Sequence, residues 1–187
     1  MKKALGFIIA ALVLIVLLFV TGTVYTVKEG QQVVKTQFGK PIGDPIKDAG
    51  LHFKLPFIVK VNVIEKRVLG WDGKSVPMPT RDKTYIEVDT FARWRIDDPL
   101  LYFKTLRDER SAISRLNDIL GSETRNAVAK HDLLEVVRST KDRKPERTDV
   151  LTEKEAVFEP IKIGRREIEK NLKEIAKDKL EDIGIKL

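Results

Sequence analysis

The chain has 187 residues, 42% hydrophobic and 34% charged, and its 35 Lys and Arg exceed its 28 Asp and Glu to give a formal net charge of +7. It contains no cysteine, which excludes disulfide bonds, thiolate nucleophiles and sulfur-ligated metals. Basic and acidic residues are interspersed, as on a solvated surface, so we expect no nucleic-acid partner. Beside a membrane the basic excess would also attract anionic lipid headgroups, and both interpretations of the charge stay open.

An uncharged run opens the chain, from Ala4 to Val27, and residues 5–20 are nearly all apolar. Roughly 20 such residues in a helix cross a hydrocarbon core about 30 Å thick. A cleavable signal peptide is the alternative, but its apolar core is shorter and ends in a small-residue cleavage site. The sequence Val20-Thr-Gly-Thr-Val-Tyr25 is a poor site of that kind. We therefore predict a retained transmembrane helix at residues 4–24.

The charges on either side of this helix predict its orientation. Lys2 and Lys3 precede it, whereas Lys28 and Glu29 nearly cancel just after it. Because positive residues are retained on the cytoplasmic side, residues 1–3 are expected in the cytoplasm and the main domain on the other side of the membrane.

The first part of the exported chain has the composition of β-strands. Residues 31–38 are rich in β-branched side chains and lie between glycine-containing turns. Residues 59–63 alternate between valine and polar residues. Residues 84–97, after a hairpin turn at 80–83, predict one long strand with a buried face and a polar face. We assign residues 25–80 to a strand-rich, membrane-proximal subdomain.

One segment in this subdomain is a candidate site. Between Gly50 and Phe57 the apolar residues alternate with polar ones, and a proline lacks the donor that an inner strand needs. We expect a strand at a sheet edge or an extended loop, which would dip into the outer leaflet if the protein is a lipid-organising module. The candidate membrane-proximal residues are Leu51, Phe53, Leu55, Pro56 and Phe57.

Residues 81–187 form the second, mixed subdomain of the predicted α+β fold. Asp98 and Pro99 predict an N-cap and a first helical residue, and Asp132 is predicted to cap a short helix. Residues 139–155 are charged and aperiodic, as in a loop or insertion. The end, Gly184-Ile-Lys-Leu187, either begins a strand that is left incomplete or packs beneath the last helix. Helical periodicity predicts helices within residues 99–103, 112–128, 133–137 and 164–183.

The sequence offers little catalytic chemistry. His52 and His131 are the only histidines, and their surroundings have no metal-ligand spacing. There is no Gly-x-Ser-x-Gly elbow and no glycine-rich phosphate-binding motif. We expect no catalytic residue, cofactor or metal, although a Ser–Lys dyad, and with it a membrane-bound hydrolase, stays open as an alternative.

The order of several motifs resembles the SPFH/band 7 (stomatin–prohibitin–flotillin–HflK/C) superfamily, and most closely its bacterial HflC group. The resemblance covers nearly the whole chain outside residues 139–155. The motifs are Val27-Lys-Glu-Gly-Gln-Gln-Val-Val34, Gln37-Phe-Gly-Lys-Pro-Ile42, Ala49-Gly-Leu-His-Phe-Lys-Leu-Pro-Phe57, Thr80-Arg-Asp82, residues 88–100, Gly121-Ser-Glu-Thr-Arg-Asn126, Gly164-Arg-Arg-Glu-Ile168 and Gly184-Ile-Lys-Leu187.

The resemblance implies a strand-rich subdomain next to a mixed one, and a scaffold with no chemistry of its own. It implies an HflK-like partner in a ring-shaped hetero-oligomer on the bacterial inner membrane, with the main domain in the periplasm. Such assemblies enclose and regulate an FtsH-like, ATP-dependent membrane protease. Family members of this group continue beyond Gly-Ile-Lys-Leu into a strand and a long helix, so relative to them the mixed subdomain is incomplete at its C-terminus. A module that organises membrane lipids is the alternative function within the family.

Overall fold

The computed structural model of the chain describes residues 6, 11–17, 22–140 and 161–187. Residues 11–17 and 22–23 are helical. Within the part of the chain that is described, no helix is both long and apolar enough to span a bilayer. The predicted transmembrane helix at residues 4–24 lies partly outside the described residues and stays a prediction. Residues 1–3 and most of the predicted insertion at 139–155 lie outside them as well.

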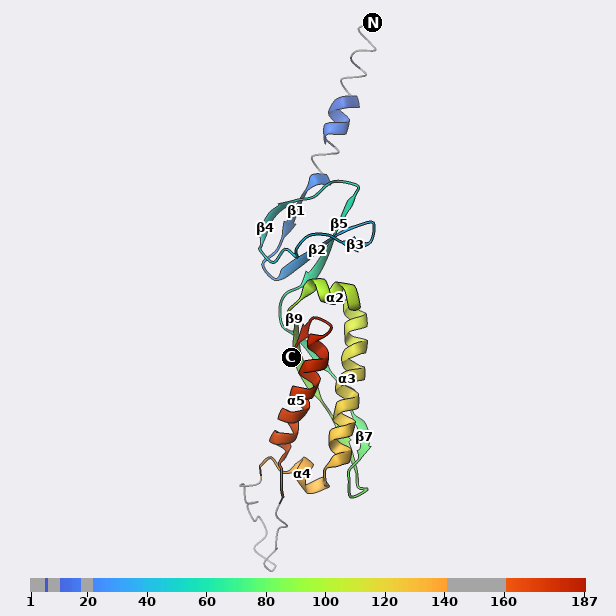
Figure 1. The fold of residues 1–187 in the computed structure, drawn as a ribbon, viewed down its shortest axis with the longest axis vertical. Helices are drawn as coiled ribbons and strands as arrows, with labels where there is room; N and C mark the ends of the chain where they lie inside the picture. The colour runs from blue at the N-terminus through green and yellow to red at the C-terminus, as the bar shows by residue number, and fades with distance from the viewer. Residues whose placement is uncertain (1–5, 7–10, 18–21, 141–160) are drawn as a thin grey trace, which may run out of the picture. The chain divides into compact units, whose positions relative to one another are not determined.

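After the N-terminal helical residues, strands come first in the chain, helices follow, and a short strand comes last (Figure 1). This order confirms the prediction of a mixed domain of strands and helices. The helices are α2 (Pro99–Thr105), α3 (Glu109–Lys130), α4 (Leu133–Val137) and α5 (Arg165–Glu181). The strands are β1 (Val24–Val27), β2 (Gln31–Gln37), β3 (Lys40–Pro41), β4 (Gly50–Phe53), β5 (Val59–Glu65), β6 (Leu69–Asp72), β7 (Val76–Pro79), β8 (Tyr85–Val88), β9 (Phe91–Ile96) and β10 (Ile185–Lys186).

These elements form two compact units. Unit 1 contains the described residues up to Val68 together with Arg95–Arg107 and Ile183–Ile185. Unit 2 contains Leu69–Trp94, the described residues of Asp108–Asp182, and Lys186–Leu187. The chain therefore passes between the units several times, whereas the sequence analysis divided it once, after residue 80.

Unit 1 is built on a three-stranded sheet in the order β3-β2-β5. β2 and β5 pair antiparallel over their whole length, from Gln31 opposite Glu65 to Gln37 opposite Val59. β1 and β4 form a separate antiparallel pair. Helix α2 packs against β2, and Asp98 caps it as predicted, accepting hydrogen bonds from the backbone N–H groups of residues 100 and 101 at 2.9 and 3.0 Å. The buried apolar side chains of this unit include Val27, Val33, Val34, Val59, Ile64, Ile96, Tyr102 and Ile185.

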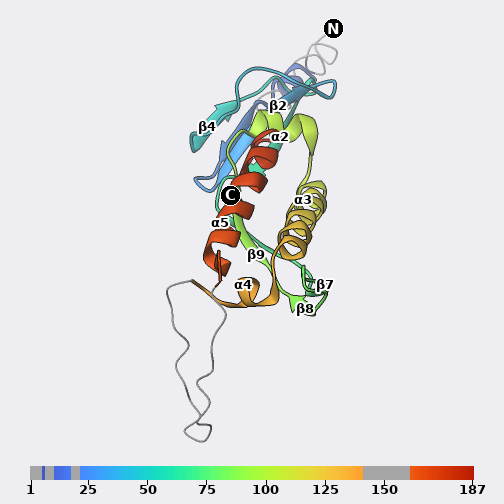
Figure 2. The same cartoon turned by 60° about the horizontal axis from the view of Figure 1, so that its bottom comes forward.

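Unit 2 contains the paired strands β6 and β9, the β7–β8 hairpin and helices α3, α4 and α5. Helices α3 and α5 pack side by side, as both views show (Figure 1, Figure 2). Their inward faces carry most of the apolar residues that the helical periodicity predicted, whereas Ile113 of α3 and Ile175 of α5 are exposed. The core of this unit includes Trp71, Met78, Trp94, Ala112, Leu116, Ile119, Leu120, Val128, Ile168, Ala176 and Leu180.

The prediction of one long strand over residues 84–97 is wrong. β8 ends at Val88 and pairs with β7, whereas β9 begins at Phe91 and pairs with β6. Between them the Thr90 carbonyl accepts a hydrogen bond from the Gly73 N–H at 2.8 Å. The alternation of apolar and polar residues continues through this break, so the pattern alone could not reveal that the strand changes its partner.

Candidate functional site

Four side chains of the predicted apolar segment are exposed in unit 1. Leu51 and Phe53 lie on β4 with exposed fractions of 64% and 68%. Leu55 and Phe57 follow in the next turn with exposed fractions of 62% and 84%, whereas Pro56 between them is buried. The structure thus brings four of the five predicted residues together as an exposed apolar surface.

This segment lies directly beside the end of the N-terminal helical residues. The backbone N–H of Lys54 donates to the carbonyl of Thr23 at 2.7 Å. A Cβ placed on Gly22 would lie 3.2 Å from the Cβ of Pro56. Because Val24 also pairs with Phe53 across β1 and β4, the segment is fixed next to the end of the predicted anchor.

Sequence analysis missed a further member of this surface, Phe38. Its side chain is 88% exposed, and it shares a two-residue turn between β2 and β3 with Gly39. Both residues have positive φ angles, 48° and 82°, as a type I′ turn requires. Since Gln37 pairs with Val59, Phe38 lies at the same end of the sheet as exposed Ile58. The sequence feature that could have identified Phe38 is its place in this turn, where Asn, Asp or Gly is usual and a phenylalanine is rare.

The backbone of this surface is strained at two of its aromatic residues. Phe57, like Phe38, has a positive φ angle, 64°. Bulky residues rarely adopt this conformation, and such strain concentrates at functional sites. Two exposed lysines belong to the strands that border Phe38 and Phe57, Lys40 at the start of β3 and Lys60 near the start of β5. Apolar groups interspersed with lysines are the chemistry of a surface that meets lipid headgroups.

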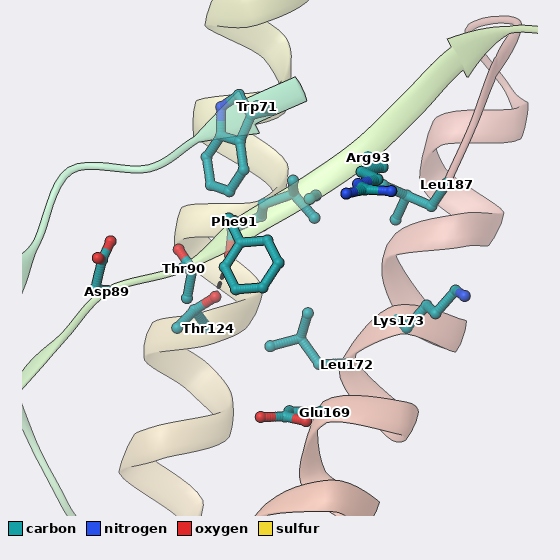
Figure 3. A pocket seen from close by; sticks show the side chains of 12 residues that line it. Trp71, Asp89, Thr90, Phe91, Arg93, Thr124, Glu169, Leu172, Lys173 and Leu187 are labelled. Atoms are coloured by element: carbon teal, nitrogen blue, oxygen red, sulfur yellow. Dashed lines mark hydrogen bonds between the residues drawn. The ribbon is translucent and has the colours of Figure 1, made fainter. Parts of the chain in front are cut away.

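Unit 2 contains a groove of about 500 Å³. Figure 3 shows Phe91 of β9 at its centre, with Thr124 of α3 and Leu172 of α5 on its walls. Two polar groups in its wall already have protein partners. The Thr124 hydroxyl donates to the Leu120 carbonyl at 2.7 Å, and the Trp71 indole N–H donates to Asn117 Oδ1 at 2.8 Å. The groove therefore presents an apolar interior and a charged rim rather than a catalytic constellation.

A second polar feature of unit 2 surrounds Glu135, which is buried on α4. Its carboxylate contacts His131 Nδ1 at 3.0 Å and accepts from the Lys162 N–H at 3.3 Å. Burial raises the pKa of Glu135, but these hydrogen bonds and the histidine outweigh it and leave the pKa below its usual range. Arg81 pairs with Asp132 and lowers the pKa of that carboxyl.

The Arg81 pair corrects the predicted role of Asp132. The Asp132 side chain makes no capping hydrogen bond to α4. Its carboxylate instead accepts from Arg81 Nε at 2.7 Å, while the Arg81 N–H donates to the His131 carbonyl at 3.0 Å. These contacts hold the β7–β8 turn against α4, which is a structural role for every charged group in the cluster.

The remaining candidate, His52, belongs to the β1–β4 pair. Its ring lies 5.8 Å from that of Tyr25, and its Nε2 is 3.0 Å from the carbonyl of Asp48. Across the described residues, no group of three or more His, Asp or Glu side chains is placed to hold a metal ion.

Comparison with known proteins identifies a family and several relatives of this chain. The chain matches the SPFH domain / Band 7 family over residues 25–187. It is 33% identical to "Protein HflC" of Treponema pallidum over 181 residues, covering 86% of this chain and 52% of that protein. It is 34% identical to "Protein HflC" of Borreliella burgdorferi over 182 residues, covering 94% and 56%.

The "Modulator of FtsH protease HflC" of Escherichia coli K12 is 28% identical over 142 residues, covering 72% of this chain and 42% of that protein. The chain thus spans about half the length of the curated relatives it matches. The family match covers the strands and helices of both units, which confirms the resemblance drawn from the motifs. The chain belongs to the SPFH domain / Band 7 family.

Proposed function

We propose that this chain is a non-enzymatic, HflC-like regulator of an FtsH-like, ATP-dependent membrane protease, acting in a hetero-oligomer with an HflK-like partner. The similarity to HflC proteins over most of the chain carries this proposal, because the E. coli relative is named a modulator of FtsH protease. Those relatives are longer, so extending their activity and partners to this chain is part of the proposal.

Co-purification and degradation assays test this role together. Tagged chain, extracted in mild detergent from membranes that contain HflK-like and FtsH-like proteins, should bring both with it. Added to FtsH-like protease in proteoliposomes, it should change the rate at which a membrane substrate is degraded, and alone it should leave the substrate intact. Recovery without partners, with no change in degradation, would contradict the proposal. Cleavage by the purified chain alone would favour the hydrolase alternative.

The proposed location is the bacterial inner membrane, with residues 4–24 as a single span, the N-terminus in the cytoplasm and the main domain in the periplasm. Consecutive apolar side chains support the span: those of residues 12–17 are 52–60% exposed on a helix. A helix that is apolar on every side is typical of one surrounded by lipid.

Because the chain has no native cysteine, single cysteines report this topology directly. In intact inner-membrane vesicles whose cytoplasmic face is outward, an impermeant maleimide should label Lys2→Cys and leave Lys74→Cys unlabelled until detergent is added. The reverse labelling pattern would contradict the proposed orientation.

The exposed apolar surface favours a second candidate function, direct contact with membrane lipid. We propose that Leu51, Phe53, Leu55, Pro56 and Phe57 form a membrane-proximal segment whose exposed side chains, with that of Phe38, enter the outer leaflet. Burying one such side chain in lipid stabilises attachment by roughly 1.5–3 kcal/mol.

Spin labels distinguish lipid contact from a merely exposed surface. A nitroxide at Phe57→Cys, in chain reconstituted into nanodiscs, should collide more with oxygen than with a water-soluble nickel complex. The control is Val68→Cys, exposed in the same unit but beyond the far end of β5. Equal preference for the nickel complex at both positions would exclude insertion of the segment.

A further inference from the structure

The exposed apolar surface of unit 1, formed by Phe38 and the exposed residues of 51–57, has a lysine within it. Lys54 is half-buried and stands between two exposed apolar residues in the sequence. Its backbone N–H donates to the carbonyl of Thr23 at 2.7 Å, at the end of the N-terminal helical residues. Lys54 is therefore attached where the proposed membrane span ends.

Two further lysines belong to the same end of the three-stranded sheet (Figure 1). Lys40 pairs with Gln37 across β3 and β2, and Lys60 pairs with Thr36 across β5 and β2. Both lysine side chains are exposed. Because Gln37 directly precedes Phe38, these lysines lie at the end of the sheet that carries this exposed aromatic side chain.

No acidic residue shares the segments that carry the apolar surface. Residues 37–43 and 50–60 contain three lysines, one histidine and no Asp or Glu. Glu65 of β5 pairs with Gln31, at the opposite end of the sheet. The fixed charge of these segments is therefore positive.

The two acidic residues between these segments, Asp44 and Asp48, belong to the loop that joins β3 to β4. This loop is held farther along the sheet, where Ile46 and Val33 exchange backbone hydrogen bonds of 2.9 Å. Val33 lies four residues before Gln37 on β2, which corresponds to about 13 Å along a strand. The loop is thus fastened to the middle of β2 and not to the end that carries the lysines.

A positively charged apolar surface beside a membrane span fits a bilayer with anionic headgroups. Apolar side chains enter the acyl region, while lysine stems extend along apolar surface and keep their ammonium groups at the level of the headgroups. Each lysine at that level favours an anionic lipid by about fivefold. A zwitterionic headgroup gains less, because its phosphate comes with a cation that repels the lysine.

We propose that this surface selects anionic phospholipids, with Lys40, Lys54 and Lys60 binding their phosphate groups in the outer leaflet. The inference rests on the proposed contact between the surface and lipid, and it adds the class of lipid that is bound. The complete chain is therefore surrounded by more anionic lipid than the bulk bilayer contains.

Spin-labelled lipids measure this selectivity in the complete chain. The chain is reconstituted into phosphatidylcholine vesicles that contain a trace of phosphatidylglycerol or phosphatidylcholine with a nitroxide on its acyl chain. The motionally restricted part of the electron paramagnetic resonance spectrum reports lipid in contact with protein. Association should be about threefold or more stronger for phosphatidylglycerol. This preference should shrink as salt shortens the Debye length from about 30 Å at 0.01 M to about 3 Å at 1 M.

Neutralising the lysines identifies the charges that select the lipid. Replacing Lys40, Lys54 and Lys60 together by glutamine should lower the preference about twofold or more, whereas arginine at the same positions should keep it. Lys2 and Lys3 stay in every variant, so their own attraction for anionic lipid cancels in the comparison. Circular dichroism of each variant shows that the fold is retained. The matched control, which should leave the preference unchanged, removes three charges from exposed positions of unit 2: Lys74→Gln, Lys130→Gln and Lys173→Gln.

Lipid contact and lipid selection fail separately in these measurements. If the nitroxide at Phe57→Cys prefers oxygen but the two spin-labelled lipids associate equally, this inference is wrong and the proposed lipid contact stands. A preference that is the same with and without the three lysines would also overturn the inference, since other charges would then select the lipid. If the nitroxide at Phe57→Cys prefers the nickel complex, the lipid contact and this inference are both wrong.

Discussion

Gly184 occupies a position that only glycine fits. Its φ angle is 78°, and its carbonyl accepts hydrogen bonds from the N–H groups of Asp97 and Asp98 at 3.1 and 3.3 Å. A Cβ there would lie 2.5 Å from the Asp98 carbonyl oxygen and 2.8 Å from the Tyr102 nitrogen. Both neighbours are backbone atoms, so neither can move aside without disturbing the start of α2.

Alanine at two glycines should therefore have opposite effects. Gly184→Ala should lower the free energy of unfolding by roughly 2 kcal/mol or more, because a strained φ and a backbone clash add together. Gly121→Ala, in α3 with open space around the new Cβ, should raise it by about 0.5–1 kcal/mol through helix propensity.

Chemical denaturation of the full chain in detergent, followed by tryptophan fluorescence, measures both changes. Equal stabilities of Gly184→Ala and the unmodified chain would show that the turn at Gly184 adapts, which the fixed position of its backbone neighbours argues against.

At the scale of elements, the short helix α4 is held by polar contacts. It has 5 residues, and its buried Glu135 carries the contacts to His131 and to the backbone of Lys162. A single-turn helix has little stability of its own. The Glu135 carboxylate therefore attaches α4 to the rest of unit 2, whereas α3 and α5 are attached by their apolar faces. Because the carboxylate is charged, its contribution to stability depends on pH.

The stability supplied by Glu135 should be lost in acid. Its pKa is lowered in the folded protein, so its charged form stabilises the fold above the usual glutamate range, and this contribution disappears as pH falls through the folded pKa. Glu135→Gln should destabilise unit 2 by about 1–3 kcal/mol at neutral pH, with the difference shrinking toward zero in acid.

Unfolding curves from pH 7 down to about 3 check this trend, since that window spans the ordinary glutamate pKa. Glu174→Gln, at an exposed position of α5, is the control and should change stability little at any pH. If Glu135→Gln lowers the free energy of unfolding by the same amount at every pH, the shape of the side chain, and not its charge, accounts for the effect.

At the scale of the whole molecule, unit 1 is assembled from parts of the chain that are distant in sequence. The buried Gln32 amide donates to the carbonyls of Ile96 at 3.1 Å and Glu65 at 3.3 Å. Tyr102 and Ile185, both buried, complete the same unit. A continuous piece of chain that ends before β9 therefore lacks part of its own core.

A fragment of residues 25–80 should consequently fail to fold alone. Without Ile96 and α2, the Gln32 amide loses a partner and the β2 face loses its cover, each at a cost of about 1–3 kcal/mol against a typical margin of 5–15 kcal/mol. Expressed separately, the fragment should give poorly dispersed amide proton signals and no cooperative thermal transition.

Residues 25–187 are the matched comparison, because they contain every described segment of both units apart from the N-terminal helical residues and Val24. Cooperative unfolding of the 25–80 fragment would show that the first subdomain, as the sequence analysis divided it, is independent of residues 95–107 and 183–185.

Local patterns accounted for most of the individual elements. β-Branched residues between glycine-containing turns located β2, and period-two alternation located β5. Helical spacing located α3 and α5, and Asp98 with Pro99 located the start of α2. The motif order also led to the family. These features were predictable because each depends on residues within one or two turns of each other, where side-chain period and capping chemistry act directly.

The tertiary structure alone decided which of these elements meet. It broke the alternating run at Thr90, placed residues 95–107 and 183–185 in unit 1, added Phe38 to the apolar surface and buried Glu135. The sequence by itself thus determined the elements and the family. Strand partners and burial required the structure, because both depend on contacts between residues far apart in the chain, which no local pattern encodes.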